Sequence, residues 1–597
     1  MLQDLEAKQI NDFLEKWHDL TYNEATESQK KQDRQERITK AIKESAAIQQ
    51  LAENPLLLTM MAILNRNQDL PRDRAKLYER SSELLLDQWD VEGKLLEDPE
   101  LKGVDIDYTD KQAMLRNVAH FMQATEKGLS GNIISQKNLE KELTKYLKTI
   151  DVNPARKVAR LMINQLRTRN FILCDVGSNY YAFVHRTFLE YFCAWSYIWQ
   201  FEKTQTLSIE GIKSEIYGKR WQDESWHETL RLIAGMLEPK FVAQIIQYLI
   251  EINIDYDCLF LAADCLVEVD EKQVDIIRKT SEHLCTEIKN LLDTFCTLHP
   301  HSRLEIKIIK TIATVWKNHY STLSWIGQLA LSAESEFIRR IAIRTLAEGW
   351  HDEPDTLSII KQCAQSDDDT NVRSNAIGQL ASGWHDEPET LSIIKQYAQF
   401  DDNSTVRANA ISQLAGGWHD ESETLSIIKQ CAQSDDDGVV RSSAISALAR
   451  GWRNEPDTFS IVKQCAQSDD SNVRRLVIYD LAEVWHDEPD TLSIIKEQTQ
   501  SDDNNIVRSN AINTLARGWR NDPKTLELLV NCAVNDPFIR DERSKYTTNP
   551  RQTALKAIVE YFPDHPTTKD LLIDRANNDR DEKVREFAQQ ALEDLSK

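Results

Sequence analysis

Residues 356–369 read TLSIIKQCAQSDDD, and residues 424–437 repeat the same letters without a change. Tryptophans follow this duplication, with spacings of 34, 34, 34, 34, 33 and 34 residues counted from Trp316. The series continues as Trp350, Trp384, Trp418, Trp452, Trp485 and Trp519, and arginines share its period at Arg339, Arg373, Arg407, Arg441, Arg474 and Arg508. A fixed period of this length predicts a repeat architecture in the C-terminal half of the chain.

One copy of the repeat is typical of two helices. Pro354 suits a first helical turn, and the apolar residues of TLSIIKQCA then recur at helical spacing. The cluster SDDD at 366–369 ends this helix and offers N-cap oxygens to the next one, which runs to Trp384. Because neither helix can bury its apolar face alone, we expect successive copies to stack into an α-solenoid.

The acidic turn followed by VRSNAIGQLA resembles HEAT and HEAT-like repeats, over residues from about 316 to 597. The signatures of tetratricopeptide and ankyrin repeats, which have similar periods, are absent. In the HEAT family the turn aspartate and the arginine that opens the second helix form a ladder between units. The resemblance therefore implies a structural ladder through Arg339 and its equivalents.

The tryptophan series allows two interpretations. Each tryptophan is either a large wedge packed between stacked helix pairs or part of an exposed aromatic ladder for a ligand. We favour the wedge, because every copy keeps the tryptophan whereas binding surfaces usually vary between copies.

The sequence predicts no metal site. Cys363, Cys431 and Cys465 share one register, but Tyr397 takes the equivalent position in another copy. The aspartate clusters lack the distal glutamate of a calcium-binding loop. Ten cysteines without a single CxxC exclude a zinc module and a disulfide scaffold, so we expect a reducing, cytoplasmic compartment.

The net charge of the chain limits the classes of partner that it is expected to bind. The formal net charge is −24, and residues 351–519 carry −15 of it. Such an acidic array argues against nucleic acid and anionic membranes as ligands and favours a basic or polar protein partner. No run of 18 apolar residues is present, so we expect no membrane span.

The first 200 residues carry a different pattern. Residues 48–64 read IQQLAENPLLLTMMAIL, a helix that enters an Asn-Pro turn and continues as an apolar helix. Residues 159–176 predict a helix followed by a strand, Gly177-Ser178-Asn179 a hairpin turn, and YYAFVHRTFLEYFCAW at 180–195 a returning strand and an aromatic helix. Helices closed by a β-hairpin indicate a winged helix.

Three strings in this region, NPLLLT, LPRDRAKLYE and FVHRTFLEYF, resemble the C-terminal part of a NACHT-type STAND ATPase. In that family, which includes NOD-like receptors, a helical lid and a winged helix fold over bound nucleotide. The proline of the first string lies against adenine, and the winged-helix histidine reaches the β-phosphate of ADP. The resemblance places these roles on Pro55 and His185. Taken singly, Pro55 would merely kink a helix and His185 would be a satisfied strand residue.

The catalytic core of such an ATPase is missing from the sequence. No segment satisfies GxxxxGK[ST], the loop that holds phosphates, and no Walker B strand is recognisable. We expect the core to precede residue 1, in a split or truncated gene product. The chain alone should then bind no cofactor and hydrolyse no ATP, and ADP or ATP would bind only together with a nucleotide-binding half.

The sequence thus predicts a mainly α protein in four parts: a lid remnant (1–69), a winged helix (70–200), a helical connector (201–315) and a HEAT-like solenoid (316–597). The resemblance implies the regulatory and sensing portion of a STAND ATPase, in a setting such as bacterial antiphage defence, and is compatible with oligomerisation on activation. The alternative is a non-enzymatic HEAT-repeat scaffold. A third reading, an enzyme related to HEAT-like phycobilin lyases, rests on the repeats alone.

Overall fold

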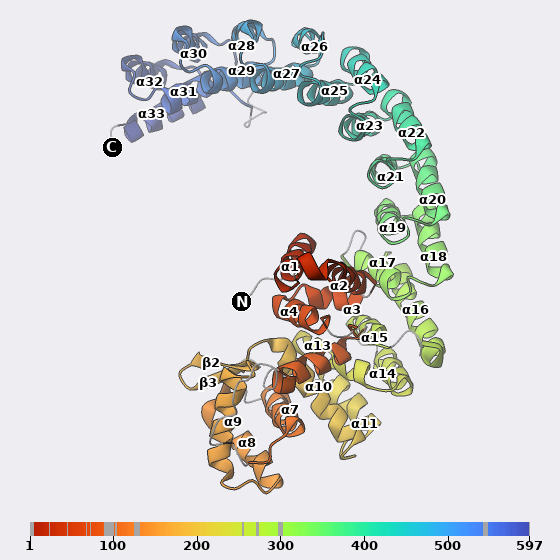
Figure 1. Ribbon diagram of the computed structural model, residues 1–597. Coiled ribbons are helices and arrows are strands. Elements are labelled where there is room, and N and C mark those ends of the chain that lie inside the picture. Colours follow the sequence, from red (N-terminus) through yellow and green to blue (C-terminus); the bar gives the residue numbers. More distant parts are fainter. Residues whose placement is uncertain are drawn as a thin grey trace. The chain divides into compact units, whose positions relative to one another are not determined.

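The computed structural model describes residues 5–22, 24–44, 46–66, 69–71, 73–88, 101, 104–124, 132–252, 256–269, 274–296, 303–540 and 547–595. Two compact units form, one from Met1–Pro300 with Lys310–Trp316 and the other from His301–Ile309 with Lys317–Lys597. Both consist almost entirely of helices (Figure 1). Within the described ranges, no helix has both the length and the apolar character that crossing a bilayer requires.

The first unit begins with the four helices α1 (Ala7–Thr21), α2 (Glu24–Glu44), α3 (Ala46–Ala52) and α4 (Pro55–Leu64). The start of α4 is fixed by local chemistry. Asn54 is its N-cap and accepts hydrogen bonds from the backbone N–H groups of Leu56 and Leu57, while Pro55 takes the first helical position. Most side chains of α4 are buried, as its apolar sequence predicts.

The next elements close into a small domain with a sheet: α5 (Arg74–Glu83), the π-helix η1 (Leu84–Gln88), α7 (Tyr108–Ala124), β1 (Ile134–Ser135), α8 (Gln136–Thr149), α9 (Ala155–Thr168), β2 (Leu173–Gly177), β3 (Tyr180–Phe183) and α10 (Arg186–Glu202). The strands are antiparallel in the order β1-β3-β2, with Leu173 opposite Phe183. Gly177, Ser178 and Asn179 turn the hairpin with positive φ angles. The predicted winged helix is therefore confirmed, whereas the two-residue β1 gave no sequence signal.

A run of helices follows the winged helix within the first unit: α11 (Ile209–Gly211), the π-helix η2 (Ile212–Tyr217), α12 (Gly218–Arg220), α13 (Glu224–Met236), α14 (Pro239–Ile252), α15 (Asp257–Val267) and α16 (Val274–Cys296). They are amphipathic, as predicted. In α14, for example, Val242, Ile245 and Leu249 are fully buried along one face.

The repeats form the second unit, which receives part of α17 (Arg303–Val315) and then α18 (Tyr320–Ser332), α19 (Glu336–Gly349), α20 (Pro354–Ser366), α21 (Thr370–Gly383), α22 (Pro388–Phe400), α23 (Ser404–Gly417), α24 (Ser422–Ser434), α25 (Gly438–Gly451), α26 (Thr458–Cys465), α27 (Ser471–Val484), α28 (Pro489–Ser501), α29 (Asn505–Gly518), α30 (Pro523–Asn535), α31 (Pro550–Tyr561), α32 (Pro566–Asn578) and α33 (Glu582–Leu595). Each copy is one first helix and one second helix. The fold class predicted from the sequence, an α-solenoid of helix pairs, is confirmed. The boundaries at 69, 200 and 315 stay predictions.

Within a copy the helix ends lie where the sequence places them. Pro354 starts α20, and Asp369 caps α21 by accepting hydrogen bonds from the backbone N–H groups of Asn371 and Val372. Trp384 ends α21, and its backbone N–H donates to Leu380. The next copy repeats this arrangement, with Pro388 at the start of α22, Asn403 capping α23 and Trp418 at its end.

The second helices are the closely packed side of this unit. In Figure 1, α21, α23 and α25 lie along the inner edge of a curved row, and α20, α22 and α24 lie along its outer edge. Fully buried aliphatic side chains such as Val372, Ile377 and Leu380 fill the space between the two layers. The inner face of the row is therefore formed by side chains of the second helices.

Candidate functional site

Pro55 and His185 lie at the starts of two helices that meet in the first unit. Pro55 is the first residue of α4, and His185 is the N-cap of α10. The side-chain amide of Asn54 contacts the His185 ring, with Nδ2 lying 2.5 Å from Nε2. Both Pro55 and His185 remain partly exposed. The structure thus brings together two motifs that are 131 residues apart, through an asparagine for which the sequence suggested only a turn.

The position of His185 follows from its place between a strand and a helix. It stands shortly after β3, and its Nδ1 lies 3.4 Å from the backbone N and 3.0 Å from the Oγ1 of Thr187. Helix N-termini carry backbone N–H groups without helical partners and the positive end of the helix dipole, so they favour anions. Two such ends with an imidazole between them fit the phosphate of the nucleotide that the NACHT resemblance implies. That role stays a prediction.

A buried charge cluster connects α5, α13 and α15. Arg74 donates from Nη1 to both carboxylate oxygens of Glu228, at 2.7 and 2.9 Å, and its Nε lies 3.5 Å from Glu268. Arg231 also donates to Glu268, at 3.0 Å. Burial raises the pKa of Glu190, on α10, to about 7. The sequence indicated that Arg74 lies at the start of a helix. It did not indicate which residues pair with Arg74, because they lie 154 or more residues further along the chain.

The predicted arginines of the second unit form a ladder with aspartates 28 residues further on. Arg373, for example, donates from Nε and Nη2 to the two carboxylate oxygens of Asp401, at 3.1 and 3.0 Å. Such two-pronged pairs join Arg339 to Asp367, Arg373 to Asp401, Arg407 to Asp435, Arg474 to Asp502 and Arg508 to Asp536. Arg441 differs, because its partner Asp469, also 28 residues further on, is 94% exposed and accepts a single contact of 3.2 Å from the arginine.

Two protein families match parts of this chain. Residues 74–197 match the winged helix-turn-helix domain C-terminal to NACHT, and residues 289–381, 362–449 and 458–547 match HEAT repeats. The chain combines a NACHT-associated winged helix with HEAT repeats. None of the curated proteins searched matches it.

The solved structures that this chain matches are distant from it. YibA of Escherichia coli shares 17% identity at a TM-score of 0.31, over 49% of this chain and 97% of that one. Kap121p bound to Pho4p shares 11% identity at a TM-score of 0.41, over 90% of this chain and 56% of that one. The C-terminal fragment of the Chaetomium thermophilum cohesin loader SCC2 shares 11% identity at a TM-score of 0.26, over 98% of this chain and 52% of that one. This chain thus spans about half the length of the last two.

The repeat tryptophans are packed at the ends of the second helices. Trp350, Trp384, Trp418, Trp452 and Trp485 are 4–8% exposed, and Trp519 is partly buried. In four of the HEAT copies a histidine stacks flat on the tryptophan, with ring centroids 4.4–4.5 Å apart: His351 on Trp384, His385 on Trp418, His419 on Trp452 and His486 on Trp519. Each of these histidines follows a tryptophan in the HDE turn, but nothing in the sequence indicated that it stacks on the tryptophan of the next copy.

Both nitrogens of each stacked histidine face oxygen acceptors. The Nδ1 of His385 lies 3.0 Å from Asp386, and its Nε2 lies 2.7 Å from the carbonyl oxygen of Gly417. An imidazole between two acceptors gains from being protonated, because both nitrogens then donate. The hydrogen bonds to the aspartate and the glycine carbonyl accordingly raise the pKa of His385, and the same holds for His351, His419 and His486.

We expect the HEAT array to become less stable as the pH rises from 6 to 8.5. A histidine whose pKa is higher in the folded than in the unfolded state (about 6.5) stabilises the fold fully below the unfolded pKa and loses this contribution as the pH passes the folded pKa. The midpoint of guanidinium unfolding should therefore fall over this range. Replacement of His351, His385, His419 and His486 by glutamine should flatten the dependence.

His565 provides the control for that titration. It caps α32, with Nδ1 3.3 Å from the backbone N of Thr567, and stacks on no tryptophan within the described residues. The variant His565→Gln should keep the wild-type pH dependence. If the midpoint of guanidinium unfolding changes equally with pH in the wild type and in the variant with all four histidines replaced, the proposed contribution of the stacked rings is wrong.

The cysteines of the array are packing residues. Cys363, Cys431, Cys465 and Cys532 are buried, and each Sγ lies 3.4–3.7 Å from a carbonyl oxygen of the preceding first helix. Burial raises the pKa of Cys431 and Cys465 to about 11, so the thiols stay protonated at neutral pH. Among the described residues, no group of three or more histidine, cysteine, aspartate or glutamate side chains could hold a metal ion.

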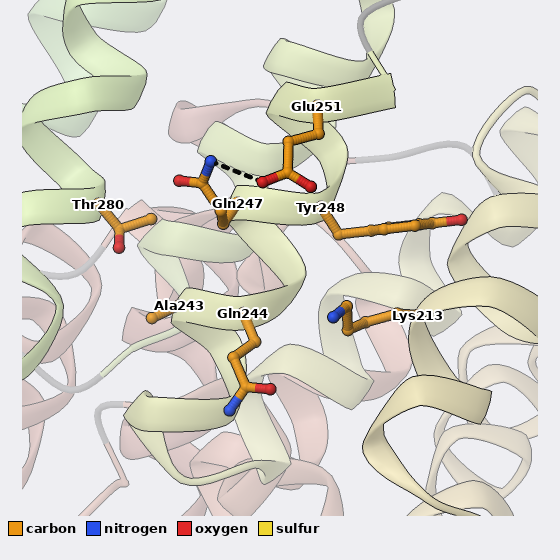
Figure 2. A pocket seen from close by; sticks show the side chains of 7 residues that line it. All are labelled: Lys213, Ala243, Gln244, Gln247, Tyr248, Glu251 and Thr280. Carbon is orange, nitrogen blue, oxygen red and sulfur yellow. Dashed lines mark hydrogen bonds between the residues drawn. The ribbon is translucent and has the colours of Figure 1, made fainter.

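A hollow of about 270 Å³ lies on the connector, along α14 (Figure 2). Gln247 donates to Glu251 at 3.0 Å, and Lys213, which donates to Glu210 at 2.9 Å, lies 5.8 Å from the ring of Tyr248. Since these polar groups largely satisfy one another, the hollow supports no functional assignment.

Proposed function

We propose that the chain is the regulatory portion of a NACHT-type signalling ATPase whose catalytic core lies on another segment or chain. In this proposal the HEAT array binds a protein partner, and the lid and winged helix control the nucleotide switch. The contact between Asn54 and His185 supports it, because it brings the starts of α4 and α10 together where the resemblance places adenine and phosphate. A role in bacterial defence signalling rests on the resemblance alone.

The residues of the junction have separable roles in the proposed switch. Pro55 presents a rigid apolar ring at the start of α4, which suits contact with a base. His185 presents an imidazole whose Nε2, once released from the Asn54 amide, can donate an N–H to a phosphate oxygen. Asn54 holds both helix starts, because its side chain caps α4 and contacts the His185 ring. ADP bound by a nucleotide-binding half would be retained through these groups, and the switch would stay closed.

In a complex reconstituted from this chain and a NACHT nucleotide-binding half, His185→Ala should weaken ADP retention at least about tenfold. A hydrogen bond to a charged group contributes about 1.5–3 kcal/mol, which sets this magnitude. The measurement is the dissociation rate of a fluorescent ADP from the complex. His283→Ala is the matched control, because His283 is a partly exposed histidine on α16 of the same unit.

Two outcomes would favour the alternative. If the nucleotide-binding half does not associate with the chain in the presence or absence of ADP, the protein is a HEAT-repeat interaction scaffold and its NACHT-like segment is a relic. If the complex forms but His185→Ala retains ADP as the wild type does, His185 has only a capping role at α10.

A further inference from the structure

The junction between α25 and α27 differs from the other joints of the HEAT array. The arginine ladder is reduced there to the single contact between Arg441 and the exposed Asp469. Arg453 replaces the stacked histidine, and Trp485 is left with Phe459 in a tilted contact at 5.8 Å. The first helix of this copy, α26, has 8 residues where its neighbours have 13. The arginine–aspartate pair, the histidine–tryptophan stack and the length of the first helix, which are regular in the neighbouring copies, are thus all reduced at this junction.

The inner face of the array also diverges at this junction. On α27 it carries Arg475, Leu476 and Tyr479. The equivalent residues of α21, α23, α25 and α29 are all small or short and polar: Ser374, Asn375 and Gly378; Ala408, Asn409 and Ser412; Ser442, Ser443 and Ser446; Ser509, Asn510 and Asn513. Tyr479 is 51% exposed, and Val439 on the facing α25 is 56% exposed. The more divergent α19 also has large residues at these positions, namely Arg340, Ile341 and Arg344. Since α21, α23, α25 and α29 stack without them, the exposed Tyr479 is not needed for stacking, whereas Leu476 is partly buried.

A hollow of about 490 Å³ lies at the surface where α25 packs against α27, and its lining includes Val439, Arg475 and Leu476, one helical turn before Tyr479. Val439 and Leu476 give it apolar walls, and its charged lining is Asp436, Asp437, Asp470 and Arg475. The lining is therefore acidic overall, within an array that carries −15 over residues 351–519. Asp436 is 92% exposed although it pairs with Arg407 at 2.7 Å. A field of this sign attracts cationic groups and steers their approach.

We propose that the α25–α27 junction docks a segment of a partner protein that carries lysine or arginine next to a large apolar residue. The basic side chain lies against Asp436 and its acidic neighbours, and the apolar one packs on Val439, Leu476 and Tyr479. This proposal rests on the partner-binding role proposed for the array and names where and with what chemistry it acts. The weakened joint lets α25 and α27 adjust to the segment.

The test is selection of a random dodecapeptide phage library on the full chain, with counter-selection on the variant L476S/Y479S. These substitutions install the residues that α25 carries at the same positions, so the variant should keep the wild-type helical spectrum and melting temperature. The expected peptides combine lysine or arginine with an aromatic or large aliphatic residue. Their Kd for L476S/Y479S should be at least about tenfold weaker than for the wild type, as for loss of a buried anchor.

Two charge variants provide a second test, and they should change the Kd of the selected peptides in opposite directions. Asp436→Asn should weaken binding of the selected peptides about two- to fivefold, and Arg475→Ser should strengthen it. Asp402→Asn is the matched control, because Asp402 pairs with Arg373 in the same register and is equally exposed, two copies before α27. Enrichment of acidic peptides, inverted signs for the two charge variants, full binding to L476S/Y479S, or no enrichment would each overturn the proposal. None of these results bears on ADP retention, which tests the proposed function separately.

Discussion

Replacement of Trp418 by alanine is expected to lower the free energy of unfolding of the HEAT array by about 3–5 kcal/mol, the usual range for a buried large aromatic residue. Trp418 is 6% exposed, ends α23 and stacks on His385 at 4.5 Å. In a solenoid, stability is close to a sum of copy and nearest-neighbour terms, so the loss should be local. Hydrogen exchange should rise first around residues 385–452, while the winged helix near His185 stays protected.

Two comparisons sharpen this test. Trp519→Ala removes the same side chain from a partly buried position and should cost less. Tyr479→Ala removes an exposed aromatic residue and should leave stability within about 0.5 kcal/mol of the wild type. If Trp418→Ala kept full stability and instead abolished binding of a partner, the tryptophans would form a recognition surface and the packing interpretation would be wrong.

Arg74→Ala should destabilise the first unit by about 3–5 kcal/mol, because it leaves buried carboxylates without their main counter-charge. The side chain of Arg74 is 3% exposed, and those of its partners Glu228 and Glu268 are 21% and 2% exposed. The measurement is denaturant unfolding followed by a probe in the first unit. Lys76→Ala is the matched control on the same helix, since Lys76 is 64% exposed and its pair with Asp73 should contribute less than about 1 kcal/mol.

The triple variant R74M/E228Q/E268Q separates the two possible sources of that loss. Neutral partners need no counter-charge, so this variant should recover much of the stability that Arg74→Ala loses. Equal destabilisation of the single and triple variants would show that packing of the arginine stem, rather than charge, is what α5 requires.

Local features of this fold were predictable because they depend on neighbouring residues. Pro354 and Asp369 determine helix starts within a few positions, and Gly177-Ser178-Asn179 turns a hairpin whose strands are adjacent in sequence. The repeat period then made the stacking predictable, since identical copies must pack in identical ways. The helix starts, the hairpin and the stacking of the repeats could all be predicted from residues that are close together in the sequence.

Contacts between distant segments were not predictable in the same way. Nothing near Asn54 indicates that it touches His185, and nothing near Arg74 indicates Glu228. The stacking of His385 on Trp418 depends on how far one copy is displaced along the next, which the period alone does not specify. The charge count likewise gave an acidic array, but the apolar and charged lining between α25 and α27 emerged only from the packing of those helices.

The reactivity of the buried cysteines reports how often neighbouring copies of the array separate. Each thiol contacts the first helix of the copy before it, and its raised pKa keeps it unreactive while the two helices stay together. A thiol-alkylating reagent therefore modifies Cys431 or Cys465 only when the neighbouring first helices separate. Since Cys465 lies on the short α26, its labelling rate relative to that of Cys431 reports how much more often the irregular copy opens than a regular one.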